Sequence, residues 1–269
     1  MKRPRRYVRQ MPKIYGNLQR PRPSFSAIFR WLSAAAWLVA ALAAVYALFF
    51  SGWFTVHTIQ VEGTHFISAD DIRSYIPPRT NIWFLPKAQI EANVLSQSSV
   101  NSVVILRGLP DTVKIIVQER QPVAIWLAGD TASLIDNQGI AFRQYGRATI
   151  PLPGTEIGDL LKDVPRIYDT KAVPVKDGQQ IVSASFITYI QSLQTQMATL
   201  VPTYSIDHYE IADTTYDLTV VTKPGMRIQV STLADAGVQV RNLSRLITQK
   251  NISPTAQVDL RIDRWAYVK

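Results

Sequence analysis

Residues 31–50 read WLSAAAWLVAALAAVYALFF and contain no charged side chain. Twenty residues in an α-helix rise about 30 Å, which is the thickness of the hydrocarbon core of a bilayer. This stretch therefore predicts a transmembrane helix over residues 31–51. The chain is then divided into a short segment before the span and a long segment after it.

The excess positive charge of the chain lies in the short segment. The 269 residues include 29 basic and 20 acidic ones, which makes the formal charge +9. Residues 1–30 contain no acid, so the remainder of the chain is neutral overall. The basic residues of this tail are Lys2, Arg3, Arg5, Arg6, Arg9, Lys13, Arg20, Arg22 and Arg30.

Basic residues beside a span hold that end of the helix in the cytoplasm. We therefore predict a cytoplasmic tail over residues 1–30, a single-pass protein of the cytoplasmic (inner) membrane, and an extracytoplasmic C-terminal region. The tail also suits contact with anionic lipid headgroups, so the bilayer is an expected partner. A nucleic-acid-binding arm is the weaker interpretation, and we expect no nucleic-acid partner because the body is neutral.

A cleaved signal peptide is the alternative interpretation of the apolar segment. Ala41-Leu42-Ala43 has the small residues of a cleavage site, but it lies inside the apolar run. Twenty apolar residues also exceed the usual signal-peptide core, so we expect the span to be retained. The absence of cysteine excludes structural disulfides and a lipid-modified cysteine.

Residues 54–122 have the pattern of a small α+β domain. Ser68 has the position of a helix N-cap, with Asp71 three residues later and Ile67 and Ile72 as a hydrophobic staple. Pro77-Pro78 ends that helix. The remaining predicted elements are a strand at 56–62, a helix at 87–97, and strands at 101–107 and 112–119 around a turn at 108–111. The order is β-α-α-β-β.

Residues 123–269 predict a second, mostly antiparallel β domain with two helices on one face. Two strands flank the turn at 136–139, and residues 151–174 are a proline-rich, irregular connection. The amphipathic helices are expected at 179–200, burying Phe186, Ile190, Leu193, Met197 and Leu200, and at 233–250, burying Ala236, Val240, Leu243 and Ile247. Further strands are expected at 204–211, 215–222 and 226–231, with a last strand at 257–263.

Four segments resemble the FtsQ/DivIB family of bacterial cell-division proteins. Residues 54–63, FTVHTIQVEG, are similar to the opening of the FtsQ-type POTRA domain, and residues 109–124 resemble its closing hairpin strand. Residues 134–139, LIDNQG, match the hairpin that opens the family's second domain. Residues 258–263, VDLRID, resemble the family's last core strand. The order of these segments behind a single span carries the resemblance.

The sequence contains no pattern that points to catalysis. His57, His65 and His208 lack metal-ligand spacing, so we interpret them as solvated or hydrogen-bonded histidines. There is no cysteine nucleophile, phosphate-binding glycine loop or serine elbow. Asp70 and Asp71 are explained by the positive end of a helix dipole. We expect no enzyme activity, no cofactor and no metal.

The last strand is the candidate binding site. Its apolar set is Val258, Leu260 and Ile262, and the opposite set includes Asp259 and Arg261. If the alternation continues, Trp265 and Tyr267 fall outside the core, where a partner strand pairs with the edge and packs on aromatic rings. A bulge that returns both rings to the core is the alternative. The candidate residues are Val258, Asp259, Leu260, Arg261, Ile262, Arg264, Trp265 and Tyr267.

The resemblance implies that this strand holds FtsB/FtsL-like coiled-coil membrane proteins, and that FtsK/FtsW/FtsI-like proteins are further partners. Relatives often carry an arginine before the aromatic residue of an earlier strand, where this chain has Thr214-Thr215-Tyr216. The expected function is a scaffold for divisome assembly at the division septum. The alternatives are a POTRA-containing envelope transport or assembly component, which would require a barrel after the POTRA repeats, and an unrelated membrane-anchored adaptor.

Overall fold

The computed structural model describes residues 25–250, 252–262 and 267–268, and it divides the chain into two compact units between Ser51 and Gly52. The first unit contains the helix α1, Phe25–Phe50, whose described side chains are almost all exposed. Residues 28–54 are long and apolar enough to cross a membrane. The expected apolar N-terminal helix is therefore confirmed, and it begins six residues earlier than the predicted span.

The second unit begins with a three-stranded sheet whose strand order is β1-β3-β2. The strands are β1 (Thr58–Glu62), β2 (Val100–Gly108) and β3 (Thr112–Glu119), and the helices are α2 (Ala69–Ser74) and α3 (Lys87–Leu95). β3 pairs in parallel with β1 and antiparallel with β2. The predicted β-α-α-β-β order is confirmed.

The core of this sheet lies on the face that the two helices cover. Ile72 of α2 and Ile90 and Val94 of α3 are at most 1 % exposed, and they join a cluster with Val113 and Ile115 of β3. Ser68 caps α2, because its hydroxyl accepts a hydrogen bond from the backbone N–H of Asp70 at 3.2 Å. Local capping and the apolar period thus place α2 as the sequence predicts.

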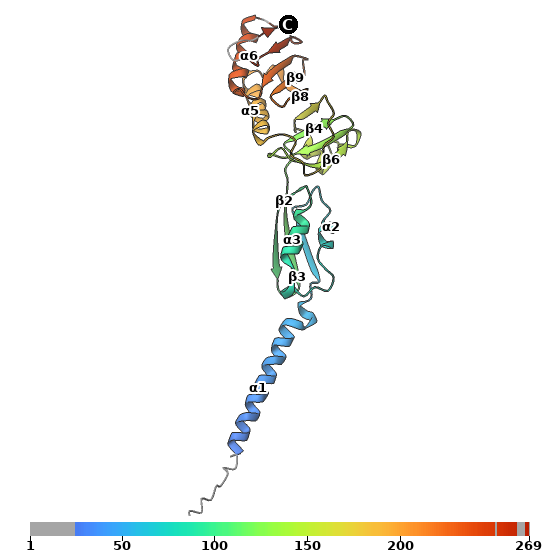
Figure 1. Cartoon of the computed structure of the whole chain (residues 1–269), viewed down its shortest axis with the longest axis vertical. Helices are drawn as coiled ribbons and strands as arrows, with labels where there is room; N and C mark the ends of the chain where they lie inside the picture. The colour runs from blue at the N-terminus through green and yellow to red at the C-terminus, as the bar shows by residue number, and fades with distance from the viewer. Residues whose placement is uncertain (1–24, 251, 263–266, 269) are drawn as a thin grey trace, which may run out of the picture. The chain divides into compact units, whose positions relative to one another are not determined.

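The rest of the second unit is built on a nine-stranded sheet within the described residues, called here the C-terminal sheet (Figure 1). Its strand order is β12-β11-β10-β9-β8-β7-β4-β5-β6. The strands are β4 (Ala124–Ala128), β5 (Thr131–Ile135), β6 (Ala141–Gly146), β7 (Arg166–Asp169), β8 (Ile206–Ile211), β9 (Asp217–Thr222), β10 (Arg227–Ser231), β11 (Gln257–Asp259) and β12 (Tyr267–Val268). The helices are α4 (Glu156–Leu161), α5 (Ala184–Leu200) and α6 (Ala236–Lys250).

The mostly antiparallel arrangement is confirmed, with parallel pairs of β4 with β7, β7 with β8, and β10 with β11. The prediction that residues 151–174 are irregular is wrong in part, because they contain α4 and the central strand β7. β7 has only four residues. An alternation over so few residues is too short to be recognised in the sequence.

Two helices, α5 and α6, pack on one face of the C-terminal sheet (Figure 1). Most of the residues predicted for their buried faces lie in this core, whereas Leu200 is 37 % exposed and Ile247 is half-buried at the margin. Ser183 caps α5 by accepting a hydrogen bond from the N–H of Phe186, so this helix starts later than the expected residue 179.

Strand β4 is buried on both of its faces. Trp126 belongs to the core beneath α5 and α6, whereas Ile125 and Leu127 belong to a separate core on the opposite face. Leu161 of α4 and Phe66, from the segment before α2, complete that second core. The helix α4 and Phe66, from the loop between β1 and α2, therefore cover the face for which the sequence predicted no helix.

Phe66 is held in this position by Glu119 at the end of β3. The Glu119 side chain is 1 % exposed, and its carboxylate accepts hydrogen bonds of 2.8–3.0 Å from the backbone N–H groups of His65, Phe66 and Ile67. The Phe66 ring then meets Phe142 of β6 edge to face, with 5.6 Å between the ring centroids. These contacts join the two sheets.

We expect Phe66→Ala to lower the free energy of unfolding by about 3 kcal/mol, since it removes a buried ring and leaves a cavity. The measurement is urea denaturation of the detergent-solubilised full chain. Leu152→Ala is the matched control, because Leu152 is 75 % exposed and its loss should cost less than about 0.5 kcal/mol. Equal effects of the two substitutions would contradict the assigned role of Phe66.

Candidate functional site

The β12 edge of the C-terminal sheet is short and weakly held. β11 has three residues and pairs in parallel with β10. β12 has two residues, and its described pairs are Val258 with Val268 and Asp259 with Tyr267. A two-residue edge strand offers backbone donors and acceptors to another chain. This edge is the part of the sheet that is best suited to accept a further strand.

The chain leaves β11 at Asp259 because its carboxylate forms a local turn. The Asp259 carboxylate accepts hydrogen bonds from the backbone N–H of Arg261 at 3.0 Å and from the Arg261 guanidinium at 2.7 Å. A side chain that bonds the backbone two residues ahead competes with a continuing strand. The expected single strand over 257–263 is therefore wrong: β11 ends at Asp259.

This turn changes which side chains are covered. Ile262, which the alternation assigns to the apolar set with Val258 and Leu260, is 56 % exposed. Tyr267 is 58 % exposed and Val268 is 41 % exposed. Tyr267 is thus exposed, but it belongs to a separate strand, so an unbroken alternation from Val258 is not the reason for its exposure. Three exposed apolar side chains lie at one sheet edge.

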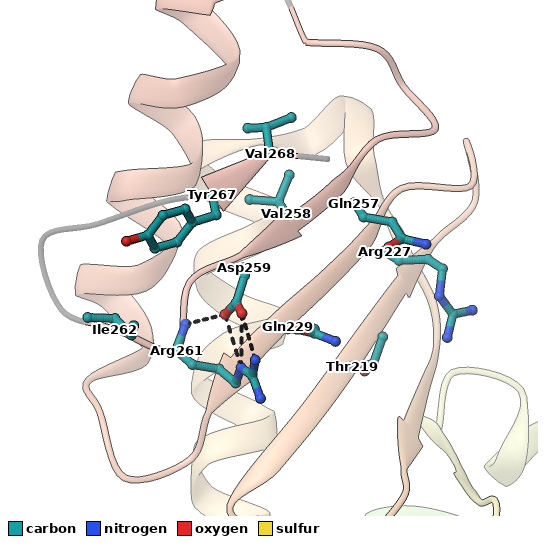
Figure 2. A pocket seen from close by; sticks show the side chains of 10 residues that line it. All are labelled: Thr219, Arg227, Gln229, Gln257, Val258, Asp259, Arg261, Ile262, Tyr267 and Val268. Atoms are coloured by element: carbon teal, nitrogen blue, oxygen red, sulfur yellow. Dashed lines mark hydrogen bonds and ion pairs between the residues drawn. The ribbon is translucent and has the colours of Figure 1, made fainter.

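These side chains border a hollow of about 770 Å³ on the side of the sheet opposite α5 and α6. Figure 2 shows the polar side chains of Thr219, Gln229 and Arg227 on neighbouring strands, with Arg261 folded back onto Asp259. The full lining consists of Thr219, Arg227, Gln229, Gln257, Val258, Asp259, Arg261, Ile262, Tyr267 and Val268. The hollow has a polar floor and an apolar rim at β12.

The polar floor continues across the sheet as an ion-pair network. The Arg227 guanidinium donates to both carboxylate oxygens of Glu210, reaching across β9. The Nε2 atom of His208 lies 3.3 Å from Glu210 Oε1, and its Nδ1 atom lies 2.7 Å from the Asp207 carboxylate. Three residues of β8 and Arg227 of β10 therefore form one charged cluster.

Partial burial opposes ionisation of Glu210, but hydrogen bonds and charges from Arg227 and His208 outweigh it. Together they lower the pKa of Glu210 below its ordinary value of 4.5. The hydrogen bond with Asp259 raises the pKa of Arg261. Arg227 and Arg261 each pair with a carboxylate and do not stand as isolated cations.

The predicted site residues fall into three groups in the structure. Val258 and Leu260 are at most 3 % exposed and belong to the core, so they support the edge from beneath. Asp259, Arg261, Ile262 and Tyr267 line the hollow. Arg264 and Trp265 lie outside the described residues. The structure brings the second group together around the turn at Asp259.

Sequence reasoning missed the floor of the hollow. The strands that contain Thr219, Arg227 and Gln229 were predicted, and their alternation identifies a polar face. The sequence does not show that this face lies beside residues 257–268, because β10 and β11 are parallel neighbours joined through the whole of α6. Only the strand order of the sheet places these residues at one site.

The three histidines lie apart from one another in hydrogen-bonding or ionic contacts with carboxylates. His57 is 3.6 Å from Asp111, and His65 is 3.6 Å from both Glu119 and Glu156. Among the described residues, no three histidine, aspartate or glutamate side chains are arranged to hold a metal ion.

Comparison with known proteins supports the architecture. The POTRA domain, FtsQ-type, matches residues 54–120. The cell division protein FtsQ of Chloroflexus aggregans is 33 % identical over 153 residues, which cover 56 % of this chain and 52 % of the relative. The cell division protein DivIB of Clostridium acetobutylicum is 32 % identical over 157 residues, which cover 53 % of this chain and 63 % of the relative. The cell division protein FtsQ of Mycobacteroides abscessus is 29 % identical over 127 residues, which cover 46 % of this chain and 40 % of the relative. The chain thus spans about half the length of the Chloroflexus relative that it matches.

An apolar N-terminal helix followed by a POTRA domain and a large β-sheet defines a single-pass, membrane-anchored POTRA protein. The FtsQ-type POTRA match and the FtsQ and DivIB relatives place the chain within that class. Its residues 54–120 match an FtsQ-type POTRA domain, and about half of the chain is similar to cell-division proteins named FtsQ and DivIB.

We expect Glu210→Gln to lower the free energy of unfolding by about 0.5–1 kcal/mol at pH 7. Because the folded-state pKa of Glu210 lies below 4.5, its contribution is present above pH 4.5 and is lost as the pH falls through the lower folded-state value. Urea denaturation at several pH values tests this. A difference between the variant and the native chain that persists at pH 2 would contradict the assignment.

Proposed function

We propose that this protein is a non-catalytic scaffold that assembles division proteins at the septum, and that the β12 edge of the C-terminal sheet binds its partners. The proposal rests chiefly on the exposed side chains of Tyr267 and Val268, which form the two-residue edge strand, and of Ile262 beside them. The similarity to proteins named FtsQ and DivIB supports a role in cell division.

The edge suits binding by strand addition. A partner segment in extended conformation would pair with the backbone of β12 and place alternate side chains over the hollow. The apolar rim at Ile262 and Tyr267 would bury apolar side chains, and the charged floor would select polar ones by complementarity. Arg261 and Arg227 are already neutralised by Asp259 and Glu210, so the floor does not require an acidic partner.

The partners proposed for this edge are FtsB/FtsL-like coiled-coil membrane proteins. The juxtamembrane segment of such a protein suits this edge, since it can supply one extended strand next to a helix. FtsK/FtsW/FtsI-like proteins are proposed as further partners, bound through the POTRA domain or the membrane span. The proposed action needs no cofactor.

The proposed topology has the N-terminus in the cytoplasm and the C-terminal region outside it. The basic residues before α1 support this orientation, because positively charged flanks remain on the cytoplasmic side. A cytoplasmic membrane location with concentration at the septum follows from the division role. The transport alternative is less well supported, since the described residues after the POTRA domain form a sheet packed with helices.

We expect Ile262→Glu to reduce co-purification of the FtsB/FtsL-like partners at least tenfold, because it places a charge in an apolar contact. Val268→Pro should act similarly, since proline removes a backbone donor from the edge strand. Leu152→Glu is the matched control, because Leu152 is an exposed apolar residue that follows β6, the strand at the opposite edge of the sheet. Undiminished capture by both variants, with unchanged thermal unfolding, would exclude the β12 edge.

Depletion of the protein in its host tests the division role separately. We expect cells to grow as filaments without completed septa, and the native gene to restore division. A gene carrying Ile262→Glu should restore division less well than one carrying Leu152→Glu. Septation is measured by microscopy and depletion by immunoblotting. Normal septation after full depletion would contradict the proposed function.

A further inference from the structure

Three loops meet at one end of the POTRA domain, formed by residues 52–57, 77–86 and 108–111, and they are called here the POTRA tip. Thr55 forms an antiparallel bridge with Asn81, and the N–H of Val56 donates to the carbonyl of Thr80 at 2.9 Å. The N–H of His57 donates to the carbonyl of Asp111 at 3.0 Å. These contacts tie the three loops into one surface.

The POTRA tip presents large apolar side chains to its surroundings. Trp53 is 83 % exposed and Leu109 is 60 % exposed, although each belongs to a different loop. Phe84 of the middle loop is also 60 % exposed. The neighbouring rings of Phe54 and Trp83 pack 5.6 Å apart and support this surface from within. Exposed apolar groups from separate loops at one end of a domain mark an interaction surface.

The charged side chains beside these apolar groups are mainly basic. Arg79 and Arg107 are exposed, and the Arg107 guanidinium donates to the carbonyl of Leu85 at 2.9 Å. Lys87 donates to the carbonyl of Ile105 at 2.9 Å. Among the described residues, no carboxylate lies within ion-pair distance of these three cations, whereas the acid Asp111 is 3.6 Å from His57. The three loops contain Arg79 and Asp111, and Arg107 and Lys87 directly adjoin them, so the border of this aromatic and apolar surface gives the region a net positive charge.

The chain itself holds this surface close to a bilayer. α1 ends at Phe50, and Trp53 follows three residues later. Three extended residues reach at most about 11 Å. The polar layer of a bilayer is roughly 5–8 Å deep on each side, so Trp53 cannot leave the vicinity of the headgroups. Tryptophan with basic residues is the combination that favours this layer.

We propose that the POTRA tip docks onto the anionic phospholipid surface at the C-terminal end of its own span, with Trp53 and Leu109 entering the interfacial layer and Arg79, Lys87 and Arg107 facing lipid phosphates. This contact is separate from the β12 edge and goes beyond partner binding. It restricts the swing of the C-terminal region about the two residues that follow α1, and so limits where the β12 edge can meet a membrane-bound partner.

The absence of cysteine in the native chain allows a direct test. A fluorophore is attached at Leu109→Cys in the full-length chain, which is reconstituted in liposomes of phosphatidylcholine and phosphatidylglycerol that contain a nitroxide-labelled lipid quencher. Asn101→Cys is the matched control, since Asn101 is exposed near the other end of β2 and lies about 26 Å further along the strand. We expect strong quenching at position 109 and little at position 101.

The electrostatic part of the proposal is tested by Arg79→Gln with Arg107→Gln in the labelled chain. The docked-to-undocked ratio should fall about thirty-fold for two basic residues, and liposomes of phosphatidylcholine alone should reduce quenching in the same way. Arg79→Gln alone should lower the ratio about five-fold, and it keeps the test valid if the double variant unfolds, because Arg107 and its bond to Leu85 remain.

Equal quenching at positions 109 and 101 would show that the tether alone brings the domain near lipid, and it would overturn the proposal. Quenching at position 109 that is insensitive to both the arginine substitutions and the anionic lipid would also overturn it. Quenching that arises only when a purified partner protein is added would assign the tip to protein binding and likewise reject lipid docking.

Discussion

Glu119 ends strand β3 and buries its carboxylate beneath the residues that precede α2. A buried charge is costly unless its oxygens are fully hydrogen-bonded, and here three successive backbone N–H groups supply the bonds. The same bonds set the path of residues 65–67 and direct Phe66 into the core beside β4. Next to this group, Arg120 pairs with Asp136 at the turn after β5. The connection between the two sheets therefore has a defined geometry built from neighbouring residues of one strand end.

This junction uses the β4–β6 end of the C-terminal sheet and leaves the β12 end for other contacts. Strand β4 is covered on both faces, by α5 and α6 on one side and by α4 and Phe66 on the other. At β12 the open face has a polar floor and an apolar rim, and the edge strand has two residues. The β4–β6 end of the sheet is therefore covered by other parts of the chain, whereas the β12 edge is exposed to solvent. Together with the proposed lipid contact at the POTRA tip, this arrangement assigns anchoring, spacing and binding to separate surfaces.

Much of the fold was predictable, because the signals were local and long enough to read. The uncharged run at 31–50, the cap at Ser68 and the periods of α3, α5 and α6 each lie within one segment of the chain. The missed elements were short: β7 has four residues and α4 has six, inside a stretch rich in proline. The prediction of one strand over 257–263 was wrong because it used only the alternation of Val258, Leu260 and Ile262. It did not consider that the Asp259 carboxylate accepts hydrogen bonds from Arg261, which form a turn. A side chain bonded to the backbone two residues ahead outweighed the apolar pattern.

The amino-acid sequence alone predicts the apolar span, the basic tail, the β-α-α-β-β order and the C-terminal segment as a binding candidate. Each depends on composition or on a period within adjacent residues. The parallel pairing of β10 with β11 is visible only in the folded chain, and it places Arg227, Gln229 and Tyr267 around one hollow. That Trp53 and Leu109 share one surface is likewise visible only in the folded chain, since their loops are 56 positions apart and meet through backbone hydrogen bonds. Such contacts depend on strand order and chain reversal, for which a single sequence contains no local signal.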